Sequence, residues 1–99
     1  MSIVITEPGK LSAAASELHS INAALFAGNA AAAGPTTSVA PAAADVVSAL
    51  TAAQFAAHAQ LYQAISAQAA WFQQQLATTL GIAAGSYAAT EAANTEIVG

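Results

Sequence analysis

Cysteine is absent from this sequence, and basic residues are almost absent. Without cysteine the chain can form neither a disulfide nor a thiolate metal site. Lys10 is the single basic residue apart from the histidines, against five acidic residues and a formal net charge of −4. A nucleic acid or an anionic lipid surface would need a basic patch on the protein, so we expect neither of them as a partner.

Charge of either sign is missing from one long stretch. No charged residue lies between Val46 and Thr90, and so long a stretch raises the question of a membrane span. It nevertheless contains seven glutamines and His58, which are costly in hydrocarbon, so we expect no span. The first residues also lack the basic region of a secretory signal peptide, and we expect any export to use another route.

Proline and glycine are concentrated where two alanine-rich stretches meet. Alanine supplies 31 of the 99 residues and favours helices. Gly34, Pro35 and Pro41 interrupt these stretches, and two prolines six residues apart cannot both lie inside one regular helix. The sequence therefore predicts an all-α fold, a two-helix antiparallel hairpin. Its single domain over residues 1–99 comprises a helix at about 7–33, a turn at 34–41, a helix at about 42–80 and a C-terminal tail at 81–99.

Local signals predict where these helices begin and end. Thr6 has the side chain of an N-cap, and Pro8 suits a first helical turn, where its missing N–H is not needed. Pro41 can occupy the first turn of the second helix. Gly81 and Gly85 are candidates for ending that helix, because glycine is the preferred residue just after a helix.

The expected first helix has one apolar row and one polar face. Apolar residues at alternating spacings of three and four are typical of two helices packed side by side. This row consists of Leu11, Ala14, Leu18, Ile21, Leu25, Gly28 and Ala32. The polar face contains Ser12, Ser16, His19, Asn22 and Asn29. Phe26 lies off the apolar row and indicates a second contact surface.

The expected second helix has two rows at this spacing. The first row is Val47, Leu50, Gln54, Ala57, Leu61, Ala64, Gln68, Trp71 and Gln75. The second row is Phe55, His58, Tyr62, Ile65, Ala69, Phe72, Leu76 and Leu80. One companion helix can cover only one row. Either the first helix covers part of each and the rest is ordinary exposed surface, or the row with Phe55 is an interface. We favour the interface, because such a row exceeds the few hundred Å² that soluble monomers usually expose.

The residues that catalysis or metal binding would need are not clustered along the sequence. His19 and His58 belong to different helices, and no carboxylate lies within a turn of His58. We therefore expect no catalytic, cofactor or metal site and no enzyme activity, and interpret both histidines as hydrogen-bonding residues at a surface or an interface. One pair is of interest: Tyr87 and Glu91, four residues apart, would share one face of a helical turn.

Four segments together resemble the PE family of mycobacterial proteins. They are the opening Met1 to Thr6, the stretch from Asn29 to Thr37, the run from His58 to Ala70 and the ending from Gly85 to Glu91. The similarity covers nearly the whole chain. The sequence departs from the family in one place: the family is named for a Pro-Glu pair near its N-terminus, whereas Pro8 is followed here by Gly9.

The resemblance implies a hairpin that pairs with a PPE protein into a mixed four-helix bundle. It also implies export by a type VII secretion system, whose Tyr-x-x-x-Asp/Glu signal is matched by Tyr87 and Glu91. Family pairs can be held in the cytoplasm before export by an EspG-type chaperone, which contacts the PPE subunit, and are then secreted or reach the cell surface. We assign the partner interface to Leu11, Leu18, Ile21, Leu25, Phe26, Phe55, Tyr62, Ile65, Phe72 and Leu76.

The residues alone leave two other functions open. The hairpin could associate with itself as a homodimeric four-helix bundle with a structural or adhesive role at the cell surface. Alternatively, the charge-free run could make it a small membrane-active protein. Expression of the chain alone separates these possibilities. Aggregation that a co-expressed partner rescues indicates the PPE partner protein, a soluble homodimer indicates self-association, and partition into lipid indicates the membrane-active protein.

Overall fold

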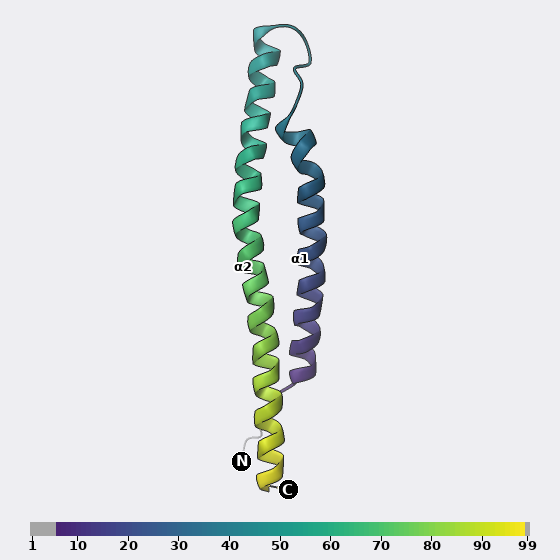
Figure 1. Cartoon of the computed structure of the whole chain (residues 1–99), viewed down its shortest axis with the longest axis vertical. Coiled ribbons are helices and arrows are strands. Elements are labelled where there is room, and N and C mark those ends of the chain that lie inside the picture. Colours follow the sequence, from purple (N-terminus) through teal and green to yellow (C-terminus); the bar gives the residue numbers. More distant parts are fainter. Residues whose placement is uncertain (1–5, 99) are drawn as a thin grey trace. The chain divides into compact units, whose positions relative to one another are not determined.

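The computed structural model describes residues 6–98, most of which are helical (Figure 1). Helix α1 runs Pro8–Thr37 and helix α2 runs Val46–Val98. No strand occurs among the described residues, and the two long helices confirm the all-α fold class. Residues 1–5, which begin the opening segment of the family resemblance, and Gly99, which ends the predicted tail, lie outside the described residues.

By its internal contacts the chain forms two units, and each unit contains part of both helices. The first unit comprises residues 6–22 and 73–98 of the described chain, and the second comprises residues 23–72. The second unit is a helical hairpin: its part of α1 and its part of α2 are antiparallel and are joined by residues 38–45 (Figure 1). The predicted reversal of the chain is confirmed there.

Helix α1 ends later than predicted, because it passes through Gly34 and Pro35 and stops at Thr37. Pro35 lies two residues before the helix end, so the hydrogen bond lost with its N–H and the crowding by its ring affect only the last turn. The Thr36 hydroxyl donates to the carbonyl oxygen of Ala32, and the Thr37 hydroxyl donates to that of Ala33, at 2.6 Å each. These threonines supply extra donors to the carbonyl groups of the last turn and so stabilise it. The prediction that the helix ends at about residue 33 was wrong.

Helix α2 begins at Val46 instead of residue 42, and Asp45 is its N-cap. One carboxylate oxygen, Oδ1, accepts a hydrogen bond from the Ser48 amide at 2.8 Å, and Oδ2 accepts one from the Ser48 hydroxyl at 3.0 Å. The hydrogen bond from the Ser48 amide, and to a smaller extent that from the Ser48 hydroxyl, hold the pKa of Asp45 below its ordinary value. Pro41 therefore belongs to the connection and not to the first turn, because the residue that can satisfy the free amides lies four positions later.

The far end of α2 also differs from the prediction, since the helix continues through Gly81 and Gly85 to Val98. A glycine that ends a helix usually adopts a positive φ angle, and no glycine among the described residues does so. The alanines around these glycines have the strongest helix propensity, which offsets the cost of roughly 1 kcal/mol that each glycine adds. The residues predicted as a tail at 81–99 are therefore helical as far as Val98.

At the start of α1 the prediction for Pro8 was right and that for Thr6 was wrong. Pro8 is the first helical residue. The carbonyl oxygen of Glu7 accepts the first amides of the helix, from Lys10 at 3.0 Å and Leu11 at 3.3 Å. The Glu7 carboxylate forms an exposed ion pair with Lys10 at 2.7 Å. Thr6 precedes this cap, and its hydrogen bonds go to α2 instead.

The buried residues of both units are small. They are Ala15, Asn22, Ala77 and Ala84 in the first unit, and Ala52 and Ala59 in the second. A buried methyl group contributes only about 0.8 kcal/mol, so the helices of each unit share a thin core. Asn22 was predicted on the polar face, yet only 8% of its surface is exposed.

The covered part of α2 follows neither of the two predicted rows, although it includes Leu80 of the second. Ala83 and Glu91 are half-buried, and the other residues of α2 with reduced exposure form a third row, made almost entirely of alanine, serine and glutamine: Ser48, Ala52, Ala56, Ala59, Gln63, Ser66, Ala70, Gln73, Ala77, Leu80 and Ala84. We call it the small-residue row. On α1, Leu11 and Leu18 are half-buried as expected, but Ala15 and Asn22 replace Ala14 and Ile21. The prediction ranked positions by apolar size, whereas small side chains allow two helices to approach closely.

Candidate functional site

Large apolar side chains remain at the surface of both units. In the second unit Leu25, Phe26, Phe55, Tyr62, Ile65 and Phe72 are exposed, and in the first unit Ile21 and Leu76 are exposed. Phe55, Tyr62 and Phe72 expose 63%, 49% and 66% of their surfaces. Aromatic side chains have about 150–250 Å² each, so these three alone expose roughly 300 Å². The second unit thus carries an apolar patch that its own helices do not cover.

Within each unit, most of these side chains lie on one side of its helix pair. In the second unit Phe55 directly precedes half-buried Ala56, and Tyr62 directly precedes half-buried Gln63. In the first unit Ile21 directly precedes buried Asn22, and Leu76 directly precedes Ala77 on the other helix. Two antiparallel helices are related by a twofold axis, so residues with the same offset from the buried positions lie on the same side of the pair. Ile21 and Leu76 therefore share one side of the first unit.

The opposite side of the second unit is chemically different. The residues that directly follow the buried alanines of α2 are Ala53 and Gln60. Phe26 lies on this side, because it is three positions before half-buried Asn29, whereas Leu25 is four positions before it. Trp71 directly follows half-buried Ala70 and lies on this side as well. Phe55 and Tyr62 lie on the other side of the second unit, which we call the aromatic side.

A groove of about 310 Å³ lies within the second unit at its connection. The last turn of α1 contributes Pro35, residue Val39 belongs to the connection, and α2 contributes Phe55, His58 and Tyr62. The continuation of α1 through Pro35, which the sequence did not predict, supplies one wall of this groove. Its lining is mostly apolar, so it suits an apolar side chain from a partner.

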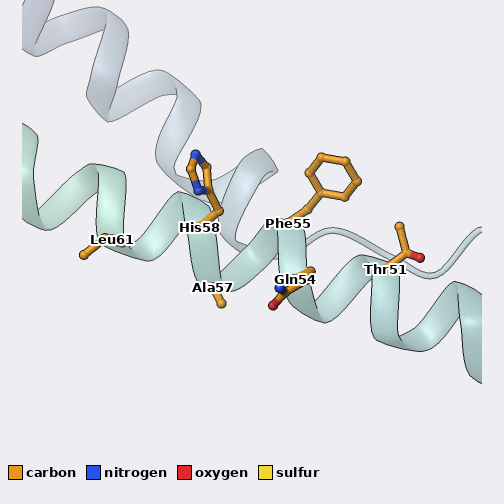
Figure 2. A pocket seen from close by; sticks show the side chains of 6 residues that line it. All are labelled: Thr51, Gln54, Phe55, Ala57, His58 and Leu61. Atoms are coloured by element: carbon orange, nitrogen blue, oxygen red, sulfur yellow. The ribbon is translucent and has the colours of Figure 1, made fainter.

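The side chains of α2 around this region point in different directions. Figure 2 shows Phe55 and His58 projecting from one side of α2, with Gln54 and Ala57 on the other. These four residues, with Thr51 and Leu61, also border an open hollow on the surface of α2. Figure 2 thus shows that α2 presents the two rings of Phe55 and His58 in one direction and Gln54 and Ala57 in another.

The described residues contain no group of three or more histidine, aspartate and glutamate side chains that could hold a metal ion. His19 lies in the first unit and is exposed, and His58 lies in the second and borders the groove. Among residues 6–98, no helix is both long and apolar enough to cross a membrane.

Tyr87 and Glu91 both lie on α2 in the first unit, where the helix places them one turn apart. Tyr87 exposes 48% of its surface, and Glu91 is half-buried. Glu91 Oε1 accepts two hydrogen bonds from Thr6: one from the backbone amide at 3.3 Å and one from the hydroxyl. Sequence reasoning missed Thr6, since no local pattern relates residues 85 positions apart.

Comparison with known proteins identifies the family of this sequence. The model of the PE family matches residues 4–94. The PE family protein PE13 of Mycobacterium tuberculosis is 60% identical over 94 residues, which make up 95% of each chain. The PE cleavage protein A of Mycobacterium marinum is 54% identical over 98 residues, and PE_PGRS33 of Mycobacterium tuberculosis is 55% identical over 94 residues. The chain spans only 18% and 19% of those two proteins.

Proposed function

Because this chain belongs to the PE family, we propose that it is a non-catalytic partner protein that pairs with a PPE protein. The two helices of this chain and two helices of the partner form a mixed four-helix bundle, and the partner covers the aromatic side. The observation that carries this proposal is the exposure of Phe55, Tyr62 and Phe72 beside a row of alanines. The alanines allow the helices of one chain to approach closely, and the large side chains remain for a second chain to bury.

Burial of the exposed aromatic side chains by a protein partner is energetically favourable compared with their exposure to water. Burial of an apolar side chain contributes about 1.5–3 kcal/mol, and buried aromatic residues are the usual hot spots of protein interfaces. The groove beside Pro35 adds a concave element that an apolar side chain of the partner can fill. Leu11 and Leu18 are half-buried within the first unit. Only their exposed parts remain for the partner to contact, so they lie at the edge of the proposed interface.

We propose further that Tyr87 and Glu91 form the signal for a type VII secretion system. The pair is secreted or reaches the cell surface, and before export it is held in the cytoplasm by an EspG-type chaperone bound to the PPE subunit. The helical spacing of Tyr87 and Glu91, together with the half-exposed phenol, supports recognition of the two side chains as one unit.

The test of pairing compares two charged substitutions on α2. Phe55→Glu places a carboxylate on the aromatic side, whereas Leu61→Glu places the same group at an exposed position two residues from both buried Ala59 and half-buried Gln63, on the face of α2 away from the covered row. A carboxylate buried without a partner costs several kcal/mol, so Phe55→Glu abolishes co-purification with a co-expressed PPE protein and Leu61→Glu retains it. Equal loss in both variants, or a stable homodimer of the wild-type chain alone, contradicts the proposal.

A further inference from the structure

We propose that Thr6 is a positioning residue for the export signal: it holds the Glu91 carboxylate in one orientation beside Tyr87. This inference rests on the proposed function of Tyr87 and Glu91. It adds a residue from the other end of the described chain that acts on the signal through Glu91. The two Thr6 donors, the backbone amide and the hydroxyl, converge on one oxygen, Glu91 Oε1.

The contact restricts a side chain that would otherwise be free. A glutamate on a helix surface samples several rotamers, and this freedom is lost when the side chain binds a partner. With Oε1 held by Thr6, the carboxylate is already ordered before recognition. The other oxygen, Oε2, forms no hydrogen bond with the described residues. It can accept a hydrogen bond from the protein that reads the signal.

Both partners of this contact are placed by helices. Thr6 directly precedes Glu7, whose carbonyl oxygen accepts the first amides of α1, and Pro8 restricts the backbone at that point. Glu91 lies seven positions after buried Ala84, which is itself seven after buried Ala77. Spacings of seven keep residues on one face of a packed helix. The small-residue row of the first unit therefore brings Glu91 to the start of α1.

The backbone of Glu91 is held separately from its carboxylate. The Thr95 hydroxyl donates to the backbone oxygen of Glu91 at 2.8 Å. Thr6 and Thr95 thus both bond Glu91 through a hydroxyl, but only Thr6 touches the charged group. This difference supplies a matched control: removal of the Thr95 hydroxyl leaves the carboxylate contact in place.

The experiment measures export, pairing and stability for the same variants of the full chain, co-expressed with its PPE partner in the secreting host. Thr6→Val removes the hydroxyl and keeps the size, Thr6→Ser keeps the hydroxyl, and Thr95→Val is the control. Ordering a rotamer-rich side chain on binding changes an equilibrium by about two- to tenfold. We expect an export ratio, exported to retained protein, about two- to tenfold lower for Thr6→Val, wild-type export for Thr6→Ser and Thr95→Val, unchanged co-purification for all three, and at most a small decrease of Tm.

Tyr87→Ala distinguishes failure of this inference from failure of the proposed function. If Tyr87→Ala is exported normally, the export signal itself is wrong. If Tyr87→Ala is retained but Thr6→Val is exported normally, the signal stands and the role of Thr6 is wrong. Loss of export by Thr6→Val together with a large fall in Tm identifies a purely structural contact. Export above the wild-type level identifies a contact that masks Glu91, and either result overturns the positioning role.

Discussion

Tyr62 donates its hydroxyl hydrogen bond to Asn29 Oδ1 at 2.9 Å, which ties an aromatic residue of the proposed interface to the other helix of the second unit. Gln63, the next residue, donates from Nε2 to the backbone oxygen of the same asparagine at 3.0 Å. Asn29 therefore accepts two hydrogen bonds from neighbouring residues of α2. The hydroxyl is oriented toward α1 while about half of the tyrosine surface remains exposed.

This geometry predicts that the ring of Tyr62 and its hydroxyl have different roles. Tyr62→Phe removes one exposed hydrogen bond and lowers the free energy of unfolding by at most about 1 kcal/mol, with pairing retained. Tyr62→Asp places a charge on the aromatic side and abolishes pairing. Urea denaturation and co-purification with the PPE partner measure the two effects. Loss of pairing in Tyr62→Phe would mean that the hydroxyl, and not the apolar ring, is what the partner requires.

A second prediction concerns Asn22, whose side-chain oxygen and nitrogen are buried and have no hydrogen-bond partner among residues 6–98. Replacement of an unsatisfied buried polar group by an apolar group of similar shape removes a desolvation cost. We expect Asn22→Leu to raise the free energy of unfolding by about 1–2 kcal/mol. Asn29→Leu is the control and has the opposite sign, since it removes the acceptor of Tyr62. Denaturant titration of both variants measures this, and a destabilised Asn22→Leu would show that the polar side chain is satisfied.

Asn22 also shows why the covered row could not be identified from the sequence. Ile21 and Asn22 are adjacent, and hydrophobicity alone assigns Ile21 to the core. In the structure Ile21 is 60% exposed and Asn22 is buried. Two helices that bury only small residues can pack closely, so the position of the alanines decided the register. In the proposed pairing, the large apolar residues left exposed are the ones that the partner covers.

Other features followed directly from local chemistry. Pro8 begins α1 as its geometry predicts. The shared face of Tyr87 and Glu91 followed from their spacing once their turn is helical, but residues 81–99 were predicted as a tail, so the continuation of α2 through them was not foreseen. The contact of Thr6 with Glu91 could not be predicted, because it depends on how α1 and α2 pack within the first unit. The roles of Tyr87 and Glu91 in export stay predictions, and so does the assignment of the ten interface residues.

The glycines of α2 lead to a third prediction. A Cβ atom added at Gly81 or Gly85 meets no other atom within 4 Å, and neither residue has a positive φ angle. Gly81→Ala and Gly85→Ala should each raise the free energy of unfolding by about 0.5–1 kcal/mol, because alanine loses less backbone entropy than glycine in a helix. Circular dichroism during thermal denaturation measures the gain. A loss of stability in either variant would indicate that α2 ends near that glycine in solution.

A fourth prediction concerns the cap of α2 and pH. The Ser48 contacts lower the pKa of Asp45 in the folded chain below its ordinary value of 3.8. The unfolded chain therefore takes up the proton first as the pH falls. The contribution of Asp45 to stability is fully present above pH 3.8 and is lost as the pH falls through the lower folded-state value. Tm measured between about pH 5 and pH 2 tests this. Asp45→Asn, which can still cap the helix, should show a smaller decrease of Tm in this range.

The last prediction separates two residues of the assigned interface. Ile21 and Phe26 expose 60% and 66% of their surfaces, and five positions on a helix place them roughly 140° apart. Ile21 lies on the side that Leu76 shares in the first unit, and Phe26 lies opposite the aromatic side in the second. A partner that covers only the side with Ile21 and Leu76 buries a charge at residue 21 and leaves one at residue 26 in water.

We therefore expect Ile21→Glu to reduce co-purification with the PPE protein by at least about tenfold, the effect of 1.4 kcal/mol, and Phe26→Glu to leave it within about twofold. Because Ile21 is exposed in the single chain, the charge is not buried by the chain's own helices, and a loss of pairing reports on the partner. Equal loss in both variants would show that the partner contacts both sides.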